Sequence, residues 1–151
     1  MKLEVEVPIK APKEKVWQTI TDFDSAADRI SGIEKIEILE KPESGLIGFK
    51  WRETRTMFGK TATEEMWITD VLENGHYNVR AESHGAIYRS TMSVTGEGNQ
   101  SVLKMTFDAE SVSFGAKVMS FLMGFMFNGA TRKALQKDLG DIKASVESSD
   151  K

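Results

Sequence analysis

Two opposite charges lie close together in a segment whose pattern is typical of a half-buried β-strand. Between Phe49 and Met57, Glu53 and Arg55 share the parity of the apolar residue Trp51. Because alternate side chains of a strand point to the same face, this strand would place both charges on its apolar face. Buried charges are almost always paired. We therefore expect an ion pair that presents a polar contact inside a cavity; the alternative is a bulge or an edge that turns both charges to solvent.

The following strand-like segment carries two adjacent glutamates whose orientation the pattern leaves open. Met66 would bring Glu64 to the inner face, whereas Trp67 would bring Glu65 there. Tyr88, further along, could give a ligand a phenol hydrogen bond, or it could pack in the sheet with its hydroxyl at the rim. If the protein is an enzyme, the acid–base candidates are Glu53, Arg55, Glu64 and Tyr88.

Cysteine and histidine, which often bind metals or take part in nucleophilic catalysis, are scarce in this chain. It has no cysteine and only two histidines, which excludes disulfides and thiolate sites. His76 and His84 each lie beside a glycine at a strand boundary, where we expect exposure to solvent, and neither has the spaced ligands of a metal site. No nucleophile–base motif or glycine-rich phosphate loop is present. We expect neither a metal nor a cofactor.

The remaining pattern predicts a sheet with few helices. Residues 2–10 alternate as a half-buried strand, a helix begins near Pro12, and a second short helix follows with Asp24 or Ser25 as its cap. Turns such as Glu73-Asn74-Gly75 are too short for crossover helices, so the later strands should be antiparallel. These strands are predicted at residues 33–39, 49–57, 61–72, 77–83, 87–95 and 102–110.

The junction of the first strand with the first helix is the most characteristic stretch of the sequence. Ile9-Lys10-Ala11-Pro12 closes the strand, and the apolar residues Val16, Trp17, Ile20 and Phe23 then recur at helical spacing. This opening resembles the helix-grip (SRPBCC) superfamily of START lipid-transfer domains, Bet v 1-like proteins and polyketide cyclase/dehydratase-like proteins. The resemblance covers nearly the whole chain and implies one α+β domain over residues 1–147, with a frayed tail at residues 148–151. In such a domain a curved antiparallel sheet of about seven strands, in the order β-α-α-β6-α, wraps a long C-terminal helix and leaves an apolar cavity.

The final helix is predicted from Phe114 or Gly115 to about Val146. Its second half has a clear buried stripe formed by Leu135, Leu139, Ile142 and Val146. The charged residues of this half are expected to turn away from the stripe: Lys133, Lys137, Asp138, Asp141 and Lys143.

The first half of this helix suggests a cavity. Projected backwards, the buried stripe meets the small or polar residues Ser120, Gly124 and Asn128, which leave volume that Phe121 and Phe125 would wall. The alternative is a kink at Gly124 or Gly129 that leaves a filled core. The opposite face is also apolar and, if exposed, would form a homodimer contact or a flexible gate through Met119, Leu122, Met123 and Met126. This apolar run is too short to cross a bilayer.

We interpret the chain as a binding protein, a carrier or sensor for a hydrophobic small molecule such as a lipid, an isoprenoid, or an aromatic or polyketide-like compound. The expected ligand contacts are Trp51, Glu53, Arg55, Tyr88, Met92, Met105, Phe107, Phe121, Gly124, Phe125 and Asn128. One alternative is an enzyme resembling polyketide cyclases or dehydratases, which would need a single acid or base in the cavity. Another is a partner-binding module like the Hsp90-activator branch of the same fold.

Bulk composition narrows the possible partners. The net charge is −3 and both signs are interspersed along the sequence, so no basic surface for nucleic acid is indicated. The first residues are charged and lack the apolar core of a signal peptide, which makes the cytoplasm the expected location.

Overall fold

The computed structural model describes residues 2–57, 60–83, 86–111 and 129–148. These residues form an antiparallel sheet of seven strands in the order β1-β7-β6-β5-β4-β3-β2, with helices on one side. The strands are β1 (Lys2–Ile9), β2 (Ile33–Glu40), β3 (Lys50–Met57), β4 (Lys60–Leu72), β5 (His76–Ser83), β6 (Ala86–Glu97) and β7 (Gln100–Ser111). The helices are α1 (Lys13–Ile20), α2 (Ala26–Arg29), with a short 3-10 turn before it, and α4 (Gly129–Ser148). This arrangement confirms the predicted helix-grip α+β fold.

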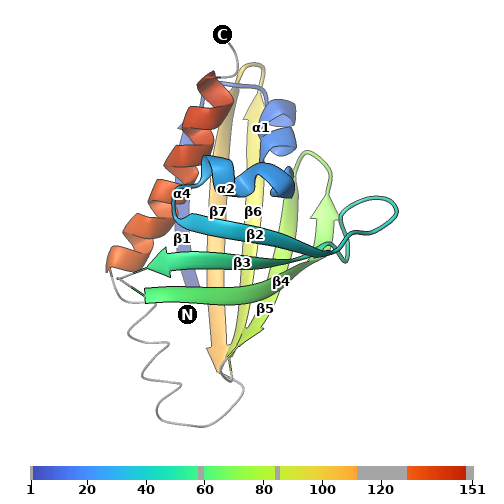
Figure 1. Ribbon diagram of the computed structural model, residues 1–151. Coiled ribbons are helices and arrows are strands. Elements are labelled where there is room, and N and C mark those ends of the chain that lie inside the picture. The colour runs from blue at the N-terminus through green and yellow to red at the C-terminus, as the bar shows by residue number, and fades with distance from the viewer. Residues whose placement is uncertain (1, 58–59, 84–85, 112–128, 149–151) are drawn as a thin grey trace.

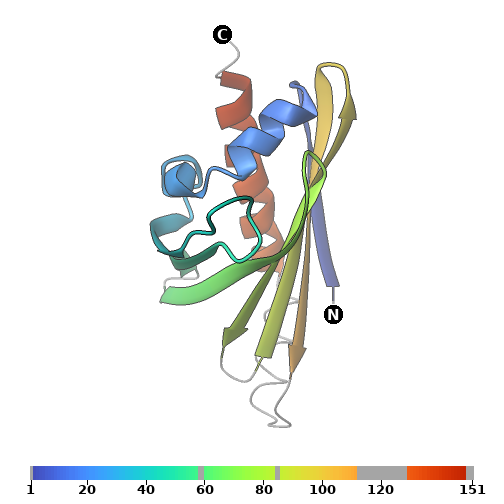
Figure 2. The ribbon, with the colours of Figure 1, turned by 90° about the vertical axis from the view of Figure 1, so that its right-hand side faces the viewer.

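The sheet curves, and its concave face holds the helices (Figures 1 and 2). In the edge-on view of Figure 2, α1 and α4 lie on the same side of the sheet, and α1 covers one end of it. No helix in the described part of the chain is both long and apolar enough to cross a membrane.

Helix α1 forms where the sequence predicted it. Pro12, with φ of −63° and an extended ψ, occupies its N-cap position, and its missing N–H would have no partner within the helix. Val16, Trp17 and Ile20 are buried on its inner side. Beyond the helix the Phe23 ring stacks on Trp51, with 4.7 Å between ring centroids. Aromatic packing therefore fills the end of the concave face beneath α1.

Helix α4 is fixed to the sheet by side chains that reach the free edge of β1. Three donors from α4 satisfy backbone carbonyls that no neighbouring strand can reach, and one carboxylate accepts from a backbone N–H. These contacts are Arg132 Nη1 to Glu4 O (2.8 Å), Gln136 Nε2 to Glu6 O (3.0 Å), Lys143 Nζ to Pro8 O (2.7 Å) and Lys10 N to Glu147 Oε2 (2.9 Å). The helix thereby takes the place of a further strand at this edge.

Three local predictions can be compared with the structure. The turn before β5 is confirmed as a tight hairpin, since Asn74 adopts φ of 61°, which asparagine tolerates better than most residues. Ser25 is indeed the N-cap residue of α2, but its side chain makes no capping hydrogen bond. At the C-terminus α4 includes Ser148, one residue into the segment that we expected to be frayed.

Candidate ligand-binding site

The concave face of β3 carries the charged pair that the sequence predicted. Trp51 is opposite Met66 of β4, and Glu53 is opposite Glu64. Trp51 and Glu53 are both buried, with exposed fractions of 4% and 9%. Because directly opposed residues of antiparallel strands share a face, Glu53 and Glu64 both lie on the inner side of the sheet.

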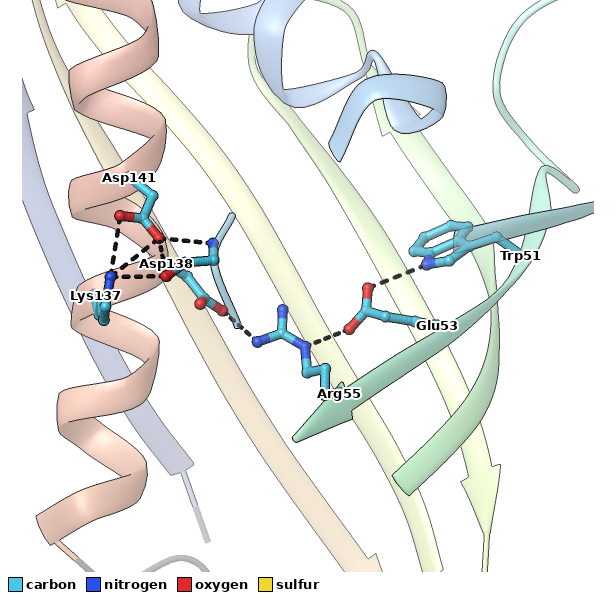
Figure 3. A network of polar contacts seen from close by, with 7 residues as sticks. Trp51, Glu53, Arg55, Lys137, Asp138 and Asp141 are labelled. Atoms are coloured by element: carbon cyan, nitrogen blue, oxygen red, sulfur yellow. Dashed lines mark hydrogen bonds and ion pairs between the residues drawn. The ribbon is translucent and has the colours of Figure 1, made fainter. Parts of the chain in front are cut away.

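A polar network joins β3 to α4 across this face (Figure 3). Arg55 Nε donates to Glu53 Oε2 at 2.5 Å, and Arg55 Nη1 donates to Asp138 Oδ2 at 2.8 Å. Trp51 Nε1 lies 3.4 Å from the other oxygen of Glu53, which it reaches as a weak donor. The predicted ion pair is confirmed, and the alternative in which both charges face solvent is wrong. One guanidinium therefore connects two carboxylates from elements far apart in the sequence.

Asp138 is the member of the network that the sequence analysis misplaced. We expected it to turn away from the buried stripe of α4, yet only 6% of it is exposed. Spacings of three and four residues separate it from Leu135 and Ile142, so it lies on the inner side of the helix. That helical spacing was the signal that could have identified its inward orientation.

Burial acts against the charged form of both Asp138 and Arg55, but only for Asp138 does it prevail over the neighbouring charges. Desolvation by burial is the largest influence on Asp138 and raises its pKa, and the Arg55 charge offsets this only in part. Desolvation also acts to lower the pKa of Arg55, but the neighbouring charges of Glu53 and Asp138 outweigh it and leave that pKa raised. The guanidinium thus stays charged, whereas ionised Asp138 is held in an unfavourable environment.

An open pocket of about 240 Å³ lies at the α4 end of this network. Arg55 and Asp138 contribute to its wall, and Lys137 lies beside them. The remaining lining residues are Ser31, Gly32, Thr56 and Ala134. Asp141 fixes the turn after α2, because its Oδ2 accepts from both the backbone N and the hydroxyl of Ser31 at 3.0 Å. The pocket therefore has a wall of fixed polar groups.

The structure resolves the orientation of the two adjacent glutamates. Glu65 lies on the convex face, where Arg52 Nη2 donates to it at 3.0 Å. Trp67 lies on the same outer face, with Lys50 Nζ 5.7 Å from its ring centroid. The strand looked ambiguous because the apolar Trp67 lies on the outer face, and because a register shift between Ile68 and Asp70 changes the parity of the strand midway. Glu64 is therefore the inward-facing residue of the pair.

The other predicted contacts that the structure describes also lie on the concave face. Met92 of β6 is paired with Met105 of β7, and both pack against the main core as partly buried residues. Tyr88 and Phe107 lie further along, with 5.8 Å between ring centroids. Burial and, to a lesser extent, the charge of Glu64 raise the pKa of Tyr88, so its phenol is a donor at neutral pH. The network and this aromatic pair thus occupy different parts of one face.

Side-chain size changes along the concave face. Near α1 the face is filled by large residues such as Ile9, Tyr77 and Leu103. Around Tyr88 the register places smaller residues, namely Ala81 opposite it on β5 and Ala109 opposite it on β7. Small side chains leave more space above a curved sheet than large ones do. This end holds a second, smaller apolar cluster, in which Leu3, Ala86 and Ala109 are buried and Leu135 of α4 packs against them together with Tyr88 and Phe107.

Several predictions fall on residues outside the described part of the chain. They concern the cavity residues Phe121, Gly124, Phe125 and Asn128, the dimer residues Met119, Leu122, Met123 and Met126, and His84. The other histidine, His76, is partly exposed at the start of β5, with Nε2 3.6 Å from Asp70 Oδ2. Within the described residues, no group of three His, Asp or Glu side chains could hold a metal ion.

Comparison with solved structures shows the fold at low sequence identity. The aromatase/cyclase Zhui from a Streptomyces species has a TM-score of 0.82 and 17% identity, and the match covers 100% of this chain and 96% of that one. A START superfamily protein from Mycobacterium smegmatis has a TM-score of 0.77 and 15% identity, with 97% of both chains covered. Norcoclaurine synthase from Thalictrum flavum has a TM-score of 0.77 and 15% identity, with coverage of 100% and 96%.

A comparison with sequence families identifies the chain more closely. No curated protein sequence matches it. The family model described as "Polyketide cyclase / dehydrase and lipid transport" matches residues 1–147. This match and the structural neighbours confirm the resemblance to the START and Bet v 1-like superfamily that the opening residues indicated. The chain therefore belongs to the polyketide cyclase/dehydrase and lipid transport family.

Proposed function

We propose that the protein binds a hydrophobic small molecule between the concave face of the sheet and α4, as a carrier or sensor. The observation that carries this proposal is the buried network of Glu53, Arg55 and Asp138 at the edge of an otherwise apolar face. Ligand sites of this kind are mostly apolar with a few polar groups that fix orientation. The apolar part of the ligand would lie along Met92 and Met105, and its polar end would reach the pocket beside Asp138.

The energetics of such a site follow from burial. Each square ångström of apolar ligand surface removed from water contributes roughly 25 cal/mol. The polar network contributes mainly by orientation, because Glu53, Arg55 and Asp138 already use part of their hydrogen-bonding capacity on one another.

One observation favours a second candidate, an enzyme that resembles the aromatase/cyclase with the same fold. Asp138 is a buried carboxyl with a raised pKa in the wall of a pocket, and it lies beside a guanidinium. Such a group can transfer a proton to or from a bound carbonyl compound. Turnover of a polyketide-like β-keto thioester by the wild type, with loss of turnover in Asp138→Asn, would support this candidate. Absence of turnover in the wild type would contradict it.

A blocking substitution tests the binding function. Met105→Trp adds volume to the concave face. Because the larger side chain would occupy the space of the ligand, we expect the affinity for the neutral probe N-phenylnaphthylamine to fall by at least about tenfold. The matched control is Val102→Trp, because Val102 lies three residues away on the convex face with 37% exposed. Probe fluorescence measures both affinities, and circular dichroism checks that both variants fold. Equal binding by the wild type and Met105→Trp would contradict the proposed location.

A further inference from the structure

The pocket beside α4 has more negative than positive charge in and directly behind its wall. Arg55 and Lys137 supply the positive charges. The carboxylates that line the pocket or contact its lining residues outnumber these cations: Asp138 in the wall, Glu53 on Arg55, Asp141 on Lys137 and Glu34 on Thr56. Arg55 is held by two carboxylates, and Lys137 Nζ lies 3.3 Å from Asp141 Oδ1. An incoming anion would therefore meet cations whose charge is already compensated.

The network has both a hydrogen-bond donor and a hydrogen-bond acceptor that the described residues do not use. Arg55 uses Nε and Nη1, and within the described residues Nη2 has no partner. Asp138 uses Oδ2 for Arg55, and Oδ1 has no partner in that same part of the chain. Both residues line the pocket. A bound group that both donates and accepts a hydrogen bond would match the pair.

The burial of Asp138 also disfavours an anionic ligand group beside it. Desolvation raises the pKa of this carboxyl even though Arg55 is in contact with it. A second anion placed nearby would add to the unfavourable electrostatic environment, because like charges disfavour each other most where water is excluded. The site therefore tolerates a neutral polar group more readily than an anionic one.

We infer that this pocket selects apolar ligands that end in a hydroxyl group over those that end in a carboxylate, and that Asp138 is the residue that determines this selectivity. The inference rests on the proposed binding function and specifies its ligand class. A hydroxyl donates to Asp138 Oδ1 and accepts from Arg55 Nη2, whereas a carboxylate only accepts and adds a negative charge. Alcohols and phenols with a long or fused apolar body are the class that fits.

Competition between two ligands of equal chain length tests the inference. In this assay, dodecanol and dodecanoate are each titrated against N-phenylnaphthylamine bound to the wild type at neutral pH. The ratio of their inhibition constants is the measured quantity. A carboxylate is also better hydrated than an alcohol, so the decisive quantity is the change of this ratio on substitution. Asp138→Asn removes the negative charge at nearly constant shape, and we expect the preference for dodecanol to fall by about tenfold, the worth of one charged hydrogen bond.

A charge-matched control separates this local effect from the overall charge of the helix. Glu147→Gln makes the same change of charge on α4 at a residue that contacts Lys10 and Lys143, away from the pocket. We expect it to leave the ratio unchanged. An unchanged ratio in Asp138→Asn, or tighter binding of dodecanoate than dodecanol by the wild type, would overturn the inference while probe binding upheld the proposed function. Failure of the wild type to bind the probe or either ligand would overturn both.

Discussion

Arg55 is the residue on which the polar network depends, because a single guanidinium forms ion pairs with two carboxylates from different elements. The side chains of Glu53 and Asp138 are only 10% and 8% exposed, so water cannot replace the arginine easily. Breaking a buried pair by removing one partner costs more than the pair itself contributes, since a charge is left uncompensated. The network therefore couples the stability of the fold to the charge state of the site.

Removing the guanidinium tests this dependence. Arg55→Met leaves Glu53 and Asp138 without a counter-charge, and we expect the free energy of unfolding to fall by about 2–4 kcal/mol in urea denaturation. Arg52→Met is the matched control, since Arg52 lies on the same strand and also bridges two carboxylates, Glu37 and Glu65, but on the solvent side. Equal losses of stability in the two variants would contradict the buried role of Arg55.

The pH dependence of stability tests the environment of Asp138. Its raised pKa means that the folded protein holds this proton more tightly than the unfolded chain does. Its contribution to stability is therefore fully present below the ordinary value of 3.8 and is lost as the pH rises through the higher folded pKa. Asp138→Asn does not titrate, so it should gain stability relative to the wild type as the pH rises from below 3.8 to neutrality.

Asp141 should show the opposite pH dependence of stability in the same experiment, because its pKa is shifted in the opposite direction. Although partial burial acts to raise its pKa, hydrogen bonds from Ser31 and Lys137 outweigh this and leave the pKa lowered. Its contribution to stability is present above the ordinary pKa and is lost as the pH falls through the folded value. Asp141→Asn should therefore lose stability relative to the wild type as the pH rises. Parallel pH trends in the two variants, followed by chemical denaturation, would contradict this assignment.

At the scale of elements, the β6–β7 hairpin requires a glycine where α4 does not. A Cβ on Gly96 would lie 2.3 Å from the backbone oxygen of Gln100, so the hairpin can accept alanine only by shifting its backbone. A Cβ on Gly140, in the exposed part of α4, would meet nothing within 4 Å. The same substitution should therefore have opposite effects at the two positions.

Alanine substitutions test this contrast. We expect Gly96→Ala to lower the free energy of unfolding by about 1–3 kcal/mol through overpacking. Gly140→Ala should raise it by about 0.5–1 kcal/mol, because alanine favours the helix and loses less entropy on folding than glycine. Thermal or urea denaturation of both variants measures the difference. Destabilisation by Gly140→Ala would show that this part of α4 is more closely packed than the structure indicates.

The elements were largely predictable because their signals are local. The alternation at residues 2–10 and the turn at Asn74 each specify structure within a few residues, and the observed β1 and β5 differ from the predicted segments by one residue. The parity of Glu53 and Arg55 was readable for the same reason. The shift in β4 between Ile68 and Asp70 was not, because a bulge depends on the partner strand.

At the scale of the whole molecule, the contacts that complete the site join segments far apart in the sequence. Arg55 and Asp138 are 83 positions apart, and nothing local to either residue encodes their meeting. The same holds for the side chains of α4 that satisfy the free edge of β1. Helical periodicity could have placed Asp138 on the inner face, but its partner becomes apparent only when the end of β3 lies beside α4, where Arg55 reaches Asp138 (Figure 3).

The most direct test of the account is to locate a bound ligand on the folded protein. Methionine and valine methyl groups are labelled, and intermolecular nuclear Overhauser effects from dodecanol are recorded by NMR. We predict contacts from the alkyl chain to the methyl groups of Met92 and Met105, which lie on the concave face. Contacts only to convex-face groups such as Val102, or none at a saturating concentration of dodecanol, would contradict a ligand site between the sheet and α4.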